Sequence, residues 1–293
     1  MLLVLTVLKI ISPIFFLGMI GFFWEKAKIE YPIEFITKLT MNVALPCLIF
    51  TSLMNTEIES NILSSIVFAT IITYTLLTVF CLFFVKLINI DVPTFLPPMI
   101  FGNTGNLGLP LAFFAFGQDG LSYAVIIFAI MAIFSLTIGI WIISGDKTLK
   151  TLLKEPTAWG AILGAVFLYF NLKTPQFITN SLELTGQIAI PVMLITLGVS
   201  VARLKLTNLS QGIIIVCYRT VMCLLIAITI SFIFNLSSIA SAVLILQLTT
   251  PIAVTSYLLS QRFNRNPNDV ANLVIISTLM SVIYIPIILS ALI

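Results

Sequence analysis

Long apolar runs separated by short polar stretches account for almost the whole chain. A helix needs about 20 apolar residues to cross the hydrocarbon core of a membrane, so each run of that length predicts one span. Ten spans are expected, at residues 2–23, 32–54, 61–87, 93–117, 119–144, 156–172, 177–202, 211–234, 238–261 and 268–292. The pattern therefore predicts an all-α integral membrane protein with ten transmembrane helices.

The fourth predicted span carries a polar interruption, Phe101-Gly-Asn-Thr-Gly-Asn-Leu-Gly-Leu-Pro110. Glycine and proline disfavour a helix, and asparagine and threonine are costly against lipid unless they find partners. Backbone at membrane depth leaves helical geometry only where protein or a water-filled cavity satisfies it. The stretch therefore predicts a broken helix at a binding site. The alternative is a tightly packed helix whose glycines only admit a neighbour, which leaves the two asparagines unexplained.

Lysine and arginine fall on one side of the predicted spans. The connections after odd-numbered spans hold Lys26, Lys28, Lys86, Lys147, Lys150, Lys154, Arg203, Lys205, Arg262 and Arg265. The connections after even-numbered spans hold only Lys173. Cytoplasmic loops are rich in Lys and Arg, so we expect a protein of the cell (inner, or plasma) membrane with both termini extracytoplasmic. Because Met1–Phe23 lacks a basic n-region and an A-x-A site, it is expected to be a retained first span.

An internal repeat relates the two halves of the chain. Shifting the sequence by 145 positions aligns Ile36–Thr51 with Ser181–Thr196, including Pro46 with Pro191 and the amides Asn42 and Gln187. The first segment starts on the cytoplasmic side and the second on the opposite side. The halves, residues 1–144 and 156–293 around a linker at 145–155, are therefore expected to be inverted five-helix repeats.

The repeat predicts a second broken helix. The same shift carries Asn106 onto Pro251, which lies in the polar cluster Gln247-Leu-Thr-Thr-Pro-Ile-Ala-Val-Thr-Ser256 of the ninth span. Interrupted segments at corresponding positions of two repeats indicate a transport site near the middle of the membrane. Two independent proline kinks are the alternative, since membrane helices tolerate them.

Composition narrows the classes of function. The chain is 60% hydrophobic and 9% charged, against roughly 25% charged in soluble domains. It has no histidine, which excludes His-ligated metal sites and Ser-His or Cys-His catalysis. The four cysteines lie in apolar segments and are expected to be reduced. We expect no enzyme, no cofactor and no nucleic-acid partner.

The motif Gly102-Asn-Thr-Gly-Asn-Leu-Gly-Leu-Pro-Leu111, followed by Phe116-Gly-Gln-Asp-Gly-Leu121, resembles the auxin efflux carrier family. That family includes plant PIN-type auxin exporters and bacterial malonate and malate permeases, and the resemblance runs along all ten spans. It implies a scaffold domain (spans 1, 2, 6 and 7) and a transport domain (spans 3–5 and 8–10), with spans 4 and 9 crossing at unwound middles. It also implies organic anions as substrates and a homodimer through the scaffold. The linker at 145–155 is far shorter than the hydrophilic loop of the plant exporters, which puts regulation through such a loop in doubt.

The two interruptions carry the candidate substrate-binding residues. Half-helix N-termini present free N–H groups and partial positive charge to an anion, and amides and hydroxyls add hydrogen bonds. The candidates are Asn103, Thr104, Gly105, Asn106, Gln247, Thr249, Thr250 and Pro251. Unwound carbonyl groups could instead hold Na⁺. Neither interruption contains Lys or Arg, so we expect no permanent ion-pair trap there.

Polar residues elsewhere in the spans give further candidates. Asn42 and Gln187 could meet the site from the scaffold side, or could form interhelical hydrogen bonds. Arg219 could attract the anion from the cytoplasm, and Glu183 is the carboxylate best placed to couple H⁺. Lys38 is expected to snorkel.

These observations predict a secondary transporter that moves a small organic anion, such as malonate, malate or an auxin-like acid, by alternating access. The coupling ion, if there is one, is expected to be H⁺ or Na⁺. A channel or a receptor-like sensor of the same fold is the first alternative. The same sequence features are compatible with a crossover that binds a ligand but does not move. An intramembrane enzyme is the second, and it lacks a His dyad, an HExxH motif and an Asp pair in the spans.

Overall fold

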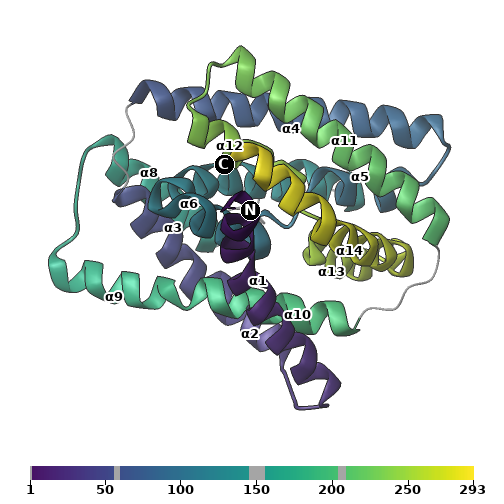
Figure 1. Ribbon diagram of the computed structural model, residues 1–293, viewed down its shortest axis with the longest axis horizontal. Helices are drawn as coiled ribbons and strands as arrows, with labels where there is room; N and C mark the ends of the chain where they lie inside the picture. Colours follow the sequence, from purple (N-terminus) through teal and green to yellow (C-terminus); the bar gives the residue numbers. More distant parts are fainter. Residues whose placement is uncertain (1, 56–59, 145–155, 204–208) are drawn as a thin grey trace.

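A computed structural model describes residues 2–55, 60–144, 156–203 and 209–293, and these segments are almost entirely helical (Figure 1). The first half contains α1 (Leu2–Lys26), α2 (Ile33–Leu39), α3 (Leu45–Met54), α4 (Ser60–Leu87), α5 (Val92–Ile100), α6 (Leu109–Phe134) and α7 (Ile140–Ser144). The second half contains α8 (Pro156–Tyr169), α9 (Gln176–Gln187), α10 (Ala189–Arg203), α11 (Leu209–Ile233), α12 (Ser238–Thr249), α13 (Val254–Arg262) and α14 (Pro267–Leu292). Short π-helical segments occupy Thr40–Ala44, Thr104–Gly108 and Ser135–Gly139. The predicted linker, residues 145–155, lies outside the described residues.

Seven helical stretches in the described residues are long and apolar enough to cross a membrane, and α8 and α12 are shorter apolar helices. The predicted all-α membrane protein is thus confirmed, whereas the count of ten spans stays a prediction. The longest stretch, Thr104–Ser144, has 41 residues. It is interrupted at Gly117, whose φ of 64° and ψ of −149° are not helical. Glycine adopts a positive φ without a steric penalty, so the chain turns here, where the sequence separates spans 4 and 5.

The helices α1 and α10 pack backbone against backbone. A Cβ atom on Gly21 would overlap the carbonyl group of Ile195, and one on Gly198 would overlap the carbonyl group of Gly18. Small residues allow this approach, which replaces the hydrophobic effect as a source of helix association in lipid. The pair therefore forms a close and rigid contact between the two halves of the chain.

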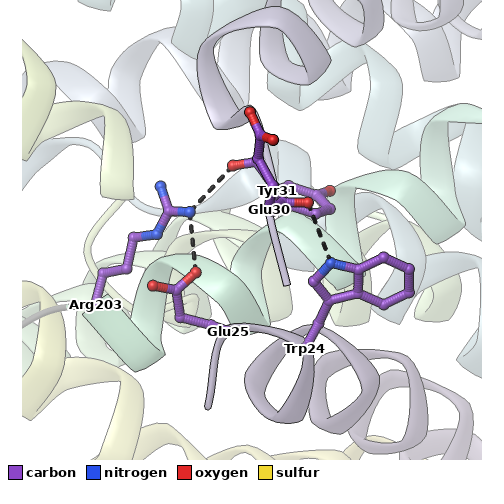
Figure 2. Close-up of polar contacts among 5 residues, drawn as sticks. All are labelled: Trp24, Glu25, Glu30, Tyr31 and Arg203. Carbon is purple, nitrogen blue, oxygen red and sulfur yellow. Dashed lines mark hydrogen bonds and ion pairs between the residues drawn. The ribbon is translucent and has the colours of Figure 1, made fainter. Parts of the chain in front are cut away.

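Polar contacts fasten the connection between α1 and α2 to the end of α10 (Figure 2). Nη2 of Arg203 lies 2.9 Å from Oε2 of Glu25 and donates to the carbonyl oxygen of Tyr31 at 3.0 Å. The hydroxyl group of Tyr31 lies 2.7 Å from Oγ1 of Thr196. Burial raises the pKa of the Tyr31 hydroxyl group above its ordinary value. These contacts fix the connection on the same helix pair that the glycines bring together.

On the opposite side of the molecule, α4 and α11 run side by side (Figure 1). The rings of Phe84 and Tyr218 stack with centroids 3.8 Å apart, and the Tyr218 hydroxyl group donates to the carbonyl oxygen of Phe80 at 3.0 Å. Both helices contact the interrupted elements: α4 packs on α5 and α6, and α11 packs on α12 and α14. The interruptions are therefore enclosed by protein.

Candidate functional site

Both predicted interruptions are breaks in helices. The helix α5 ends at Ile100, Phe101 is extended, and the chain becomes helical again at Thr104. The helix α12 ends at Thr249, and α13 begins at Val254. Each break thus leaves a short non-helical segment between two half-helices.

The two breaks pair with each other through main-chain atoms; we call this junction the crossover. It consists of an antiparallel bridge between Gly102 and Ile252, a hydrogen bond from Asn103 N to the Pro251 oxygen (2.7 Å) and one from Ala253 N to the Phe101 oxygen (3.3 Å). Backbone groups freed by one break are thereby satisfied by the other, as burial in a membrane requires.

The local sequence explains why the chains can approach so closely. A Cβ atom on Gly102 would lie 2.5 Å from Oγ1 of Thr250 and 2.9 Å from Nη2 of Arg219, so only glycine fits without displacing them. Pro251 has no N–H group and therefore leaves no donor unpaired at the break. The next donor, Ile252 N, is satisfied by Oγ of Ser277 at 3.0 Å. Sequence reasoning missed Ser277, although a serine buried inside an apolar span was its signal.

Arg219 brings a cation to the crossover from another helix, although neither interruption itself contains Lys or Arg. This residue of α11 is 1% exposed and donates to the backbone carbonyl oxygens of Met99 (3.1 Å), Thr250 (2.8 Å) and Leu248 (3.5 Å). It therefore binds the C-terminal ends of both α5 and α12. Its side chain is buried and is not presented at the surface of the described protein.

A cavity of about 770 Å³ reaches the crossover. On the crossover side its lining includes Asn103, Gly105, Asn106, Ala253, Thr255 and Ser256. Its other walls come from α2 to α8, α13 and α14; they are mostly apolar and include the cationic residue Arg262. The first turns of two half-helices, after Asn103 and after Ala253, thus lie at one cavity. Helix N-termini carry free N–H groups and partial positive charge, so this end of the cavity is suited to an anion.

The first interruption places its predicted residues at or beside this cavity. Asn103 is 5% exposed and lines the cavity, and within the described part of the chain its Nδ2 atom has no hydrogen-bond partner. Gly105 is buried and Asn106 is half-buried, and both line the cavity. Thr104 is fully buried and is not among the lining residues. Its Oγ1 atom also has no partner among the described residues.

The second interruption places its predicted residues inside the protein. Gln247, Thr249, Thr250 and Pro251 are buried and are not among the residues that line the cavity. The hydroxyl groups of Thr249 and Thr250 donate to carbonyl groups of their own segment, at 2.8 Å to Ile245 and 2.7 Å to Gln247. Sequence reasoning instead missed Thr255 and Ser256, which follow the proline in the first turn of α13 and line the cavity.

The structure does not bring the other candidates to the cavity lining. Asn42 and Gln187 are exposed. Glu183 is half-buried in α9, and its Oε1 accepts a hydrogen bond from Nδ2 of Asn55 at 3.0 Å. Lys38 is exposed and pairs with Glu34 at 2.6 Å, one helical turn away.

Comparison with known proteins identifies the family to which the chain is similar. The model of a family described as "Membrane transport protein" matches residues 6–148 and 144–289. A protein of Methanocaldococcus jannaschii named as an uncharacterized transporter is 29% identical in an alignment of 195 residues that covers 63% of this chain and 63% of that protein. A second uncharacterized transporter, of Methanothermobacter thermautotrophicus, is 24% identical in an alignment of 265 residues that covers 86% of each chain. The first match thus spans less than two thirds of the relative.

Proposed function

Because the chain belongs to the membrane transport protein family, which is the auxin efflux carrier family that its sequence resembles, we propose that it is a secondary transporter of a small organic anion. The family places the chain among membrane transporters. The substrate class and the mechanism of alternating access are our proposal. One observation carries it: a cavity that is lined by Asn103, whose buried Nδ2 atom has no partner among the described residues, and by residues in the first turns of two half-helices.

The proposed substrate has a carboxylate group and an apolar or short polar body. The carboxylate would bind at the crossover end, where Asn103 and Asn106 offer amide donors and the helix N-termini offer partial positive charge. The apolar walls would cover the rest of the molecule. Malonate, malate and auxin-like acids all fit this description, and indole acetate matches the apolar walls most closely.

The proposed moving part is the crossover with the helices that enclose it. In this proposal α4–α7 and α11–α14 form the transport domain, and α1–α3 and α8–α10 form the scaffold. The backbone contact of α1 with α10 supports a rigid scaffold, because helices in such close contact resist sliding. The cavity supports the division, since its walls come from both groups of helices. Extracytoplasmic termini and a homodimer through the scaffold belong to the same proposal.

Counterflow in proteoliposomes tests the function. Vesicles loaded with unlabelled acid should accumulate the labelled acid transiently, for at least one of malate, malonate, succinate and indole acetate. A carrier exchanges substrate in this way. A channel would equilibrate the label without trans-stimulation, and a sensor would bind the acid without uptake. Either of these results would replace the transporter by the corresponding alternative.

A further inference from the structure

Arg219 is held in the way that proteins hold a bound metal cation. Its guanidinium group lies among main-chain carbonyl oxygens from two separate helix ends, Met99 of α5 and Leu248 and Thr250 of α12. In the part of the chain that the structure describes, it forms no ion pair with a carboxylate group. Unwound carbonyl groups at broken helices are the ligands that hold Na⁺ in other transporters. Here an arginine side chain takes those oxygens.

The charges at this point balance. A helix C-terminus carries roughly half an elementary negative charge, so the ends of α5 and α12 together carry about one. The guanidinium group supplies one positive charge, and the protein buries it to 1% exposure. The N-terminal ends that begin at Thr104 and Val254 keep their positive partial charge, because no described ion pair offsets it.

We propose that Arg219 is a built-in cation that replaces a metal ion at the crossover, so that the anion site works without bound Na⁺. This rests on the proposed function only in naming the cargo as an anion; the cation itself is a property of the fold. Arg219 neutralises the negative helix ends and leaves the positive ends to attract the substrate. It is a positioning residue, since it binds the backbone that carries the site and is not itself among the residues that line the cavity.

Thermal unfolding of the purified protein tests the proposal without any substrate. Wild-type protein should unfold at the same temperature in sodium chloride and in choline chloride of equal concentration. Arg219→Ala leaves buried carbonyl groups without their cation and should lower the midpoint by roughly 5 °C or more. Low-millimolar guanidinium chloride, compared with choline chloride, should restore part of that loss, because the free ion fits the vacated space. Na⁺ should also raise the midpoint of this variant.

Arg265→Ala is the matched control. Arg265 also donates from its guanidinium group to a main-chain carbonyl oxygen, that of Ile143 at 3.0 Å, but outside the crossover. The midpoint of thermal unfolding of this variant should be the same in guanidinium, sodium and choline chloride. A similar guanidinium response in Arg265→Ala would show that the effect is not a property of the crossover, and would overturn the proposal.

Two further results would overturn it. The first is a higher midpoint of the wild-type protein in Na⁺ than in choline, because the site would then bind a metal ion beside Arg219. The second is an Arg219→Ala variant that folds and responds equally to guanidinium and choline. If Arg219→Ala cannot be purified, Arg219→Lys keeps a charge and should unfold independently of Na⁺; Na⁺ dependence there would count against the built-in cation. Since these measurements need no transport, a failure of counterflow would refute the proposed function alone.

Discussion

The substitution Asn103→Ala distinguishes a role of Asn103 in binding the proposed substrate from a role in the stability of the crossover. The side chain is 5% exposed and lines the cavity, and its Nδ2 atom has no partner among the described residues. The backbone N–H of residue 103 donates to Pro251, and alanine keeps that bond. The substitution therefore removes a donor to the proposed substrate without breaking a described side-chain hydrogen bond of Nδ2.

The size of the effect follows from these contacts. A hydrogen bond to a charged group contributes roughly 1.5–3 kcal/mol, which is about tenfold to a hundredfold in affinity. A buried amide without a partner costs roughly 1–3 kcal/mol in the empty protein, so the unfolding midpoint of Asn103→Ala should stay unchanged or rise. Asn103→Asp should bind more weakly than Asn103→Ala, because it sets a negative charge against an anion in a low-dielectric site.

The assay measures two quantities for each variant: binding of the labelled acid that binds the wild-type protein best, and the midpoint of thermal unfolding. Asn180→Ala is the control. This asparagine lies on α9, and its Oδ1 atom accepts a hydrogen bond from Gln176, one helical turn away. It should bind the acid as the wild type does. If Asn103→Ala and Asn103→Asp also bind as the wild type does, the anion does not lie at the crossover. If Asn103→Ala lowers the midpoint and spares binding, the amide is structural.

Other substitutions test the junction, the coupling and the orientation. Gly102→Ala adds a methyl group where its neighbours leave no room and should reduce folded yield and transport, whereas Gly18→Ala, with no atom within 4 Å of an added Cβ, should do neither. Glu183→Gln should abolish any dependence of uptake on a pH gradient and leave binding intact; wild-type uptake that ignores such a gradient would remove Glu183 from the coupling. Cysteines introduced at position 58 and at the C-terminus should be labelled from outside the cell, and one at position 150 should not. The reverse pattern of labelling would show that both termini face the cytoplasm and would refute the predicted orientation.

The breaks could be predicted from the sequence because their causes are local. A cluster of glycine, asparagine and proline in the interior of an apolar segment disfavours a continuous helix, and the predicted repeat, which shares Pro46 and Pro191, indicates where a second break belongs. The sequence therefore located both interruptions to within a few residues.

Which side chains meet at the site could not be predicted in the same way. Position along a span gives depth in the membrane, but the direction of a side chain depends on the helix register. Asn42 lies in the π-helical segment Thr40–Ala44, and such a segment shifts the register of an α-helix. The structure exposes this residue. Arg219 is the opposite case, a residue that lies inside the protein. Two turns into a span, a long side chain could snorkel to the membrane surface or turn inward. The carbonyl groups of α5 and α12, which the sequence does not place, determine that it turns inward.

The junction between the breaks depends on main-chain atoms. The bridge between Gly102 and Ile252 and its two flanking hydrogen bonds use N–H and C=O groups, which every residue except proline supplies in full. Gly102 leaves room for this contact, and Arg219 and Ser277 bind main-chain atoms beside it, so these three positions constrain it more than the side chains that line the cavity. In the proposed transporter, single substitutions along the cavity would therefore change which acid binds and would leave the main-chain contact between the two breaks in place.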